Sequence, residues 1–378
     1  MKNNFDLNQT PLVVIWEVTR ACDLACFHCR ASAQPGRNPL ELSTAEGKKL
    51  IDDIAQLDPP IFIFTGGDPL KRPDIYELVE YAASKYLHPA MTPSATPLLN
   101  PESLTSLKRA GLRRLALSLD GPTPELHDSF RGVPGSFERT LDAMHWANAI
   151  GLPVQINTTV SRRNIGELEN ILSVIRSFRI VMWSLFFMVP TGRAGTEDLP
   201  SAEEFEYAFA QIHHLAEQLP FKVKTTEAQH YRRYMLQHRP GTNQKEPSAD
   251  GVPGILPINE GKGFMFISHT GQVQPSGFLP ISAGNVRQDS VQDIYRNSEL
   301  FLRLRDTHNL QGKCGECEFR EICGGSRARA YAVTGNAFAE DPSCAYVPKA
   351  ATKRRQLKCS NERQCRYQVK DGQATHCG

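Results

Sequence analysis

The first two thirds of the chain alternate between apolar runs, which are typical of buried strands, and segments with the spacing of amphipathic helices. The apolar runs are LVVIWEVT, IFIFTGG, HPAMTPSAT, LRRLALSLD, PVQINTTV and IVMWSLFFMV, which begin at Leu12, Ile61, His88, Leu112, Pro153 and Ile180. Capping signals mark three of the helix starts: Ser43 with Glu46, Asn100 before Pro101, and Ser201 with Glu204. The pattern predicts six strand and helix units.

Six β/α units are too few to close the usual eight-stranded barrel. We therefore expect an α/β fold in the form of a partial (β/α)6 barrel, similar to a TIM barrel with an open side. Parallel strands in such folds carry their chemistry at their carboxyl ends. The residues that follow each strand are therefore the first candidates for a functional site.

Composition narrows the class of protein. The 378 residues, 40% of them hydrophobic, suffice for a large domain and a smaller one. The net charge of +2 argues against nucleic acid as a partner. The N-terminus MKNNFDLNQT lacks the apolar core of a signal peptide, and the longest apolar run, residues 180–189, is far shorter than the roughly 20 residues that span a bilayer. We expect a cytoplasmic protein without a membrane segment.

The ten cysteines fall into two groups. Cys22, Cys26 and Cys29 follow the first strand, and the other seven all come after residue 313. Because cytoplasmic thiols are kept reduced, so many cysteines indicate bound metal rather than disulfides. The segregation predicts two separate sites on two domains.

The spacing Cys22-x3-Cys26-x2-Cys29 leaves two alternatives open. A structural zinc site needs four ligands, and His28 is a candidate for the fourth. A [4Fe-4S] cluster held by three thiolates instead leaves one iron free, which a small chelating ligand can occupy. We favour the cluster, in which a cofactor completes the site.

The segment WEVTRACDLACFHCRA, residues 16–31, resembles the cluster loop of the radical S-adenosylmethionine (SAM) enzymes. In that family the amino and carboxylate groups of SAM chelate the open iron, and a 5′-deoxyadenosyl radical made from SAM removes hydrogen from an unactivated C–H bond. The resemblance implies that the chain is such an enzyme, an oxidoreductase or lyase, with SAM and a [4Fe-4S] cluster as cofactors. It identifies no catalytic residue that touches the substrate.

The same resemblance assigns SAM contacts to residues near the strand ends. His28 stands where the family often has an aromatic residue near the adenine, FTGGDPL carries a GGE-like motif for the SAM ammonium, and SLDG matches a segment that contacts ribose and methionine. Arg131 resembles the basic residue at the SAM carboxylate, and the VPTGRAG turn, residues 189–195, stands at the adenosine pocket. Ordinary turns and a solvated arginine are the alternatives. The implied SAM-binding residues are His28, Gly66, Gly67, Asp68, Ser118, Asp120, Arg131 and Asn157.

The C-terminal part begins with a predicted hairpin that turns at residues 269–271, followed by a helix from about Ser290. It continues with Cys314-x2-Cys317-x5-Cys323 and Cys344, a spacing that also fits a zinc ribbon. In context it resembles the SPASM or Twitch extension of radical SAM enzymes, which holds auxiliary iron-sulfur clusters. Two cysteines of the full SPASM form are absent, at residues 275–276 and 324–326. The resemblance implies one auxiliary [4Fe-4S] cluster with four cysteine ligands, the Twitch form.

These features divide the chain into four parts. Residues 1–225 are the predicted radical SAM barrel, 226–260 a linker, 261–348 the auxiliary-cluster domain and 349–378 a basic tail. From Lys349 to Lys370 the tail has eight lysines and arginines against one acid, and it carries Cys359, Cys365 and Cys377. Three interpretations of the tail stay open: a solvated, partly disordered element, a clamp for an anionic substrate, or a third metal-binding patch.

The substrate class rests on a narrower resemblance. The first cysteine segment and CGECEFREICGGSRARAYAVTG, residues 314–335, resemble the radical SAM enzymes of alternative haem biosynthesis, the branch of anaerobic haem synthase and d-type haem maturation. This implies oxidative decarboxylation or removal of tetrapyrrole propionates, with Arg320, Arg327 and Arg329 as donors to the carboxylates. Two alternatives stay open, a maturase that crosslinks a ribosomally made peptide and a non-catalytic metal-cluster scaffold. The implied partners are a tetrapyrrole or peptide substrate and an electron donor such as flavodoxin or ferredoxin.

Overall fold

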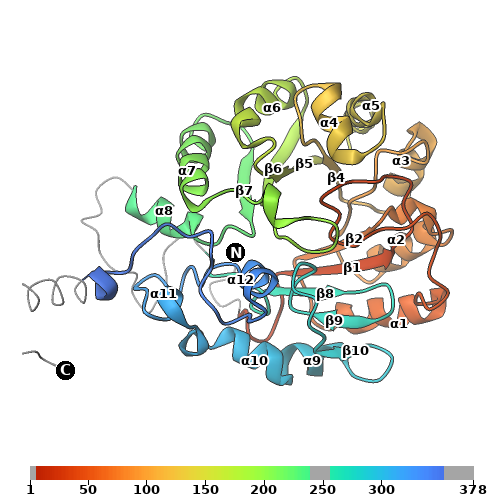
Figure 1. The fold of residues 1–378 in the computed structure, drawn as a ribbon. Coiled ribbons are helices and arrows are strands. Elements are labelled where there is room, and N and C mark those ends of the chain that lie inside the picture. Colours follow the sequence, from red (N-terminus) through yellow and green to blue (C-terminus); the bar gives the residue numbers. More distant parts are fainter. Residues whose placement is uncertain (1–5, 239–255, 353–378) are drawn as a thin grey trace, which may run out of the picture.

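A computed structural model describes residues 6–238 and 256–352 of the chain. Within these residues the strands form one ten-stranded sheet, in the order β10-β9-β8-β1-β2-β3-β4-β5-β6-β7. Figure 1 shows the sheet curving around a central space, with helices on its outer side. The strands are β1 (Val13–Thr19), β2 (Ile61–Gly66), β3 (Pro89–Met91), β4 (Arg114–Ser118), β5 (Val154–Val160), β6 (Ile180–Phe187), β7 (Lys222–Thr226), β8 (Phe264–Ile267), β9 (Gln272–Gln274) and β10 (Gly284–Asn285).

The six predicted strands are all present as β1 to β6, and each pairs in parallel with the next. The helices between them and after β6 are α1 (Thr44–Ala55), α2 (Ile75–Ser84), α3 (Pro101–Arg109), α4 (Pro124–Arg131), α5 (Ser136–Ala149), α6 (Leu168–Ile175) and α7 (Ala202–Ala216). Ser43, Asn100 and Ser201 each cap a helix by accepting a hydrogen bond from the backbone N–H three residues on. These elements confirm the partial (β/α)6 barrel.

The sheet extends beyond the six predicted strands at both ends. β7 pairs in parallel with β6, and β8 pairs in parallel with β1. An interior strand such as β1 needs a neighbour on each edge to satisfy its backbone, and β8 supplies it from the segment predicted as the auxiliary-cluster domain. The barrel and the C-terminal module therefore share one sheet.

The core between the sheet and the helices fixes β1 in place. Trp16 is fully buried there, and its ring centroid lies 5.9 Å from that of Phe64. A Cβ at Gly47 of α1 would lie 2.6 Å from the Trp16 ring. Glycine costs about 1 kcal/mol relative to alanine in a helix, but here it makes room for the indole. This packing anchors the strand that leads into the first cysteine loop.

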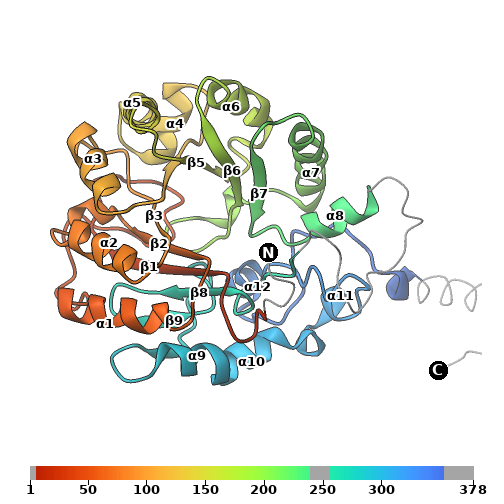
Figure 2. The same ribbon diagram turned by 180° about the vertical axis from the view of Figure 1, so that it is seen from behind.

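The C-terminal module covers the gap between the two ends of the curved sheet. Figures 1 and 2 show α12 (Arg327–Thr334) between β7 and the β8–β9 hairpin. Ser276, which follows β9, donates a hydrogen bond to the carboxylate of Glu227, which follows β7, at 3.4 Å. Arg329 of α12 donates to the backbone carbonyl of Glu227 at 3.0 Å. The open side of the barrel is therefore filled by protein.

The predicted hairpin and helix of this module are confirmed. β8 and β9 pair antiparallel around the expected turn, and Ser290 caps α9 (Val291–Asn297). The remaining helices are α8 (Tyr231–Gln237), which lies in the predicted linker, α10 (Glu299–Arg305) and α11 (Gly312–Gly315). The tail cysteines Cys359, Cys365 and Cys377 lie outside the described residues.

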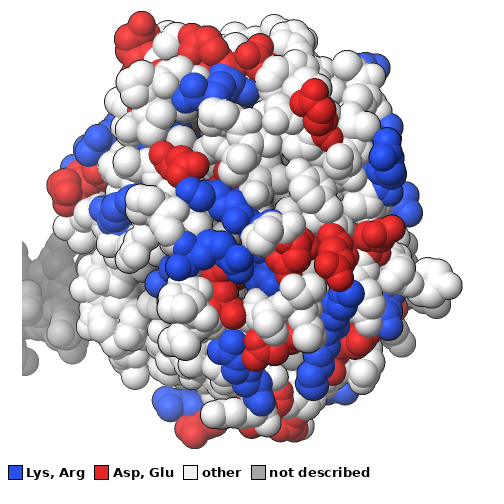
Figure 3. Space-filling model, turned by 90° about the vertical axis from the view of Figure 1, so that its right-hand side faces the viewer, with Lys and Arg blue, Asp and Glu red and all other residues white. Residues whose placement is uncertain are grey.

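Two observations concern the surface and the membrane. On the face drawn in Figure 3, basic and acidic side chains are interspersed, in keeping with the net charge of +2. In the part of the chain that the structure describes, no helix is both long enough and apolar enough to cross a membrane.

Candidate functional site

The loop after β1 brings Cys22, Cys26 and Cys29 to one end of a large central cavity, which all three line. Cys22 and Cys26 are buried, Cys29 is half-buried, and none forms a disulfide. The Cys22 N–H donates to the carbonyl of Gln34 at 2.8 Å and closes the base of the loop. The three cysteines thus lie together at the carboxyl end of β1, where the sequence predicts them.

Two neighbouring segments support this loop through backbone contacts. The N–H of Ala25 donates to the carbonyl of Arg131, at the end of α4, at 3.0 Å. The N–H of Arg193 donates to the carbonyl of Cys29, also at 3.0 Å. A Cβ at Gly192, where φ is +64°, would lie 2.3 Å from that carbonyl oxygen. The VPTGRAG turn therefore holds the cysteine loop in addition to lining the cavity.

Gly192→Ala is expected to lower the free energy of unfolding by about 1–3 kcal/mol, because alanine is strained at a positive φ. Its methyl group would also displace the Cys29 carbonyl, so iron uptake on anaerobic reconstitution should fall. Chemical denaturation and iron analysis measure the two effects. Gly36→Ala is the matched control, since a Cβ there meets nothing within 4 Å. Equal losses in both variants would contradict the supporting role.

The FTGGDPL motif at the end of β2 packs against the same loop. Gly66 and Gly67 line the cavity, and a Cβ at Gly67 would lie 2.5 Å from the carbonyl oxygen of Ala21. Asp68 does not line the cavity. Its buried carboxylate accepts hydrogen bonds from the Thr96 hydroxyl at 2.9 Å and from a backbone N–H two residues on. The glycines thus allow the end of β2 to pack closely against the cysteine loop, and Asp68 holds the loop that contains Thr96.

Ser94 is a member of this site that sequence analysis missed. Its hydroxyl donates to the carbonyl of Gly67 at 3.1 Å and lies 3.3 Å from Cys22 Sγ. Ser94 follows β3, so its place after a strand was the available signal. It connects the glycine motif to the first cysteine.

The SLDG segment contacts Arg131, which in turn lies beside Cys26. Ser118 lines the cavity, whereas Asp120 is fully buried outside the lining and forms an ion pair with Arg131. Asp120 also accepts the N–H of Thr159 at 2.7 Å. Arg131 Nη1 lies 3.8 Å from Cys26 Sγ. The structure therefore makes Asp120 a positioning residue that orients the arginine toward the cysteine loop.

His28 faces the cavity from within the cysteine loop. Its ring packs on Phe27 and Phe130, with centroid distances of 5.1 and 5.6 Å. Burial, and then the charge of Arg131, holds the imidazole pKa well below its usual range, so the ring is neutral. Its Nδ1 is buried and has no hydrogen-bond partner among the described residues. A flat neutral ring with a free polar atom fits the adenine of SAM. Asn157 of β5 lines the same cavity.

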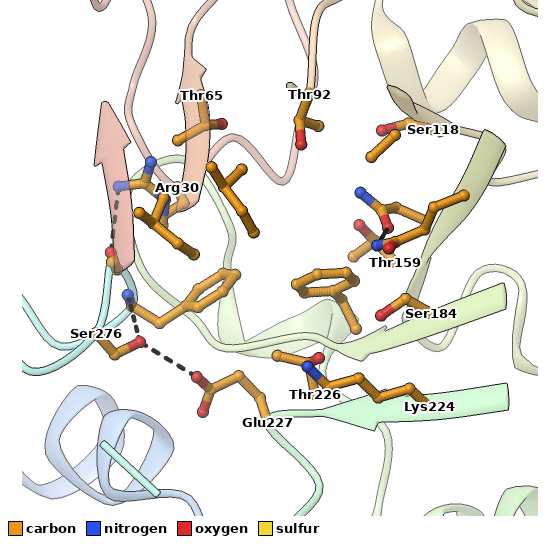
Figure 4. Close-up of a pocket in the computed structure, with 18 of the residues that line it drawn as sticks. Arg30, Thr65, Thr92, Ser118, Thr159, Ser184, Lys224, Thr226, Glu227 and Ser276 are labelled. Carbon is orange, nitrogen blue, oxygen red and sulfur yellow. Dashed lines mark hydrogen bonds between the residues drawn. The ribbon is translucent and has the colours of Figure 1, made fainter. Parts of the chain in front are cut away.

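The cavity has a volume of about 720 Å³ and extends from the cysteine loop to the first residues of the strands. One wall is apolar and comes from β1, β2 and β8, with Val13, Ile15, Ile61, Ile63, Phe264 and Phe266. The other comes from β4 to β7 and is richer in polar side chains, and Figure 4 shows Ser118, Thr159, Ser184 and Lys224 on it. Apolar side chains of the same strands, Met182, Phe186 and Val223, also line it. Among the lining residues, seven basic side chains, Arg30, Arg114, Arg131, Arg193, Lys222, Lys224 and Arg232, face two acids, Glu227 and Glu260. Arg131 and Arg30 are paired with carboxylates outside the lining, those of Asp120 and Glu17. The other basic residues still outnumber the acids, so the cavity combines two different walls with an excess of positive charge.

A second, smaller pocket lies in the C-terminal module and is lined by Cys314, Cys317, Cys323 and Cys344. Cys314 Sγ accepts the N–H of Asp341 at 3.4 Å, and Arg327 Nη2 lies 3.7 Å from the same sulfur. Donors of this kind stabilise thiolates and tune the potentials of clusters bound to them. Burial raises the pKa of the Cys317 thiol to about 12 and that of Cys344 to about 11. Metal binding at this pocket must therefore release protons.

The arrangement of the thiols bears on the kind of metal. Within residues 6–238 and 256–352, no group of three or more His, Cys, Asp or Glu side chains is placed to hold a metal ion directly. A structural zinc site needs four ligands around one ion, whereas a cubane cluster binds each thiolate through a different iron. Two sets of soft thiolates, each around its own pocket, fit such clusters.

The prediction that Arg327 and Arg329 bind substrate carboxylates is wrong. Both side chains are fully buried. Arg327 donates to backbone carbonyls of residues 337 and 339, and Arg329 pairs with Asp341. Arg320 donates to the Gly315 carbonyl at 3.2 Å, beside the second pocket. Because α12 is packed between the two ends of the sheet, its arginines hold the module together.

Three basic residues that reach the cavity, Lys222, Lys224 and Arg114, were missed by sequence analysis. Lys222 and Lys224 lie on β7, and Arg114 begins β4. In KVKTT, lysines alternate with valine, which is the pattern of a strand whose one face is exposed to solvent or to a polar cavity. This alternation was the signal available for β7.

Comparison with known proteins identifies the family. Residues 16–175 match the Radical SAM superfamily, and residues 259–318 match SPASM, an iron-sulfur cluster-binding domain. An AdoMet-dependent heme synthase from Nitratidesulfovibrio vulgaris is 41% identical over 92% of this chain and 95% of its own. A PqqA peptide cyclase from Rhodopseudomonas palustris is 29% identical over 89% of this chain and 88% of its own. The structure of Streptococcus suis SuiB bound to S-adenosylmethionine shares the fold, with a TM-score of 0.69 and 16% identity over 89% of this chain and 78% of that one.

The chain therefore belongs to the radical SAM superfamily and carries a SPASM iron-sulfur domain. Its class is that of enzymes which use SAM and a [4Fe-4S] cluster, with an auxiliary iron-sulfur cluster in the C-terminal domain. The predicted fold class, enzyme class and cofactors are confirmed, and so is the similarity to the haem-synthesising branch. The alternative of a non-catalytic scaffold is excluded by this membership.

Proposed function

We propose that the enzyme decarboxylates propionate side chains of an iron tetrapyrrole, as a haem synthase. The observation that carries this proposal is the two-walled cavity, with an apolar wall on β1, β2 and β8 and a more polar, basic wall on β4 to β7. A tetrapyrrole has the matching chemistry, because its macrocycle is flat and apolar and its propionates are anionic. Arginine and lysine are the donors that bind carboxylates best. The 41% identical relative supports the same substrate class.

We assign the N-terminal cluster to Cys22, Cys26 and Cys29, and the auxiliary cluster to the four cysteines of the second pocket. SAM would lie at the cysteine end of the cavity, against His28, Gly66, Gly67, Ser118, Arg131 and Asn157, all of which line it. Asp68 and Asp120 would not touch SAM. Asp68 would position the loop that carries Thr96, and Asp120 would position Arg131.

When bound, SAM and the reduced N-terminal cluster supply a 5′-deoxyadenosyl radical, and the auxiliary cluster supplies an electron acceptor. The substrate loses one hydrogen atom from the propionate carbon next to the ring, then carbon dioxide and one electron, and a vinyl group remains. The protein must hold that carbon at the SAM end of the cavity and exclude other hydrogen donors. An external flavodoxin or ferredoxin would supply the electron that reduces the first cluster.

The wild-type enzyme is expected to bind an iron porphyrin that bears propionates with micromolar affinity, seen as a shift of the Soret band. Turnover with SAM and a reductant under anaerobic conditions should release carbon dioxide and form 5′-deoxyadenosine. Gas analysis and chromatography measure the two products. The same porphyrin with methyl-esterified propionates is the control, and it should release none.

Absence of any Soret shift, together with modification of a peptide encoded beside this protein, would reject haem chemistry. The enzyme would then be a peptide maturase, which is the class of the 29% identical PqqA peptide cyclase.

A further inference from the structure

Three basic side chains from three different elements line the cavity, and the charges of two of them, Arg114 and Arg232, act on the third, Lys224. Arg114 begins β4, Lys224 lies near the middle of β7, and Arg232 belongs to α8. Lys224 lies opposite Ser184 of β6 in the sheet register, and Figure 4 shows both on the cavity wall.

Among the described residues, two of the three positive charges of this group, those of Lys224 and Arg114, have no carboxylate partner. In the described part of the chain, neither the Lys224 nor the Arg114 side chain has a hydrogen bond or an ion pair. Arg232 is fixed by hydrogen bonds to the backbone carbonyls of Ile258 and Ile322, which leave its charge in place. Two acidic groups act on Arg232: the thiol of Cys323 and the carboxylate of Glu260, and the carboxylate already accepts the N–H of Ala328 at 2.9 Å.

Burial, and then repulsion within the group, lower the pKa of Lys224. The Lys224 side chain is accessible from the cavity, but the cavity lies inside the protein, so protein atoms surround the ammonium group. This burial is the main cause that lowers the pKa of Lys224 to about 8. The charges of Arg232 and Arg114 add to the effect. An unpaired cluster of like charges destabilises a protein unless an anion offsets it.

The group lies at a distance from the SAM end that suits a large ligand. Arg114 is four residues before Ser118 on the same strand, which corresponds to about 13 Å at about 3.3 Å per residue. Lys224 is three strands away from Ser118 in the same register row, about 14 Å along the sheet. A macrocycle with carboxylates on opposite edges can place one edge at Ser118 and another at the basic group.

We propose that Arg114, Lys224 and Arg232 form a carboxylate subsite that binds the propionates of the tetrapyrrole that do not react. This inference rests on the proposed function and adds the means by which one propionate is directed to the SAM end. The subsite fixes the ring by its far edge, so the carbon to be attacked lies at the cysteine loop.

The test is a titration with an iron porphyrin that carries four propionates, followed by the Soret shift, with its tetramethyl ester as the uncharged probe. Lys224→Gln and Arg114→Gln are each expected to weaken binding of the acid by about tenfold or more and to leave ester binding unchanged. Lys224→Arg keeps the charge and should restore acid binding. Lys49→Gln on the exposed face of α1, where Lys49 pairs with Asp53, is the matched control and should bind the acid like the wild type.

Each outcome decides a different point. Equal weakening of acid and ester would show a general disturbance of the cavity and would overturn the subsite. Unchanged acid binding in the Lys224→Gln, Arg114→Gln double variant would remove the subsite and leave the proposed function standing. If the wild type binds neither probe, the proposed function fails and the subsite fails with it.

Discussion

Replacing Cys22, Cys26 and Cys29 together with alanine is expected to abolish formation of 5′-deoxyadenosine. In our assignment these thiols are the protein ligands of the N-terminal cluster. The auxiliary cluster has four cysteine ligands, so it offers SAM no open iron to chelate. Anaerobically reconstituted wild-type protein should hold about eight irons, as two cubane clusters require, and the variant about four. Chromatography of the nucleoside products and iron analysis measure the two effects.

The C-terminal pocket provides an internal control for this variant. Its four cysteines are untouched and lie in a separate module, so their cluster and its absorption should persist. Retained SAM cleavage in the triple variant would sink the assignment of the first cluster. Loss of all iron would instead show that the loop is needed for folding, and a single Cys29→Ala change, at the half-buried position, would then be the variant to use.

The features that sequence predicted correctly are those encoded locally. The strands β1 to β6 and their helices follow from apolar runs and capping residues, and the cysteine loops follow from spacing within a few residues. Ser43 caps α1 as predicted because the cap depends only on Ser43 and Glu46. Local patterns of this kind do not depend on which distant segment packs nearby.

The features that sequence could not predict depend on pairing between distant segments. β8 joins β1 although about 250 residues separate them, and no periodicity reveals that contact. Arg329 was expected to bind substrate, but α12 packs against the end of β7 and its guanidinium is fixed by Asp341. Lys224 was missed for the opposite reason, because β7 is too polar to resemble a buried strand.

A third limit of the sequence concerns the orientation of side chains at the ends of strands. Asp68 and Asp120 were both predicted to contact SAM because they follow strands in family motifs. Their positions are as expected, but both carboxylates are buried outside the cavity lining and bind protein groups. Sequence position therefore located the site, while the direction of each side chain required the packing of the next loop.

Removing one ligand of the auxiliary cluster is expected to separate SAM cleavage from product formation. Cys317→Ala is the suitable variant, because Cys317 is half-buried, whereas Cys314 is buried and contacts both the Asp341 N–H and the Arg327 guanidinium. Decarboxylation to a vinyl group needs an acceptor for one electron, so carbon dioxide release should be almost completely lost. Formation of 5′-deoxyadenosine should continue, since it depends on the first cluster. Iron should fall from about eight to about four atoms per chain.

The amounts of iron, nucleoside and carbon dioxide in Cys317→Ala distinguish the roles that the second pocket can have. Loss of iron with carbon dioxide release at the wild-type rate would mean that the electron leaves by another route. Loss of zinc in place of iron would show the module to be structural, and it would require a different account of the N–H groups and the Arg327 guanidinium that point at Cys314. An uncoupled variant, with nucleoside formed and no carbon dioxide, is the result that only an electron-accepting cluster predicts, because a structural site would affect both products together.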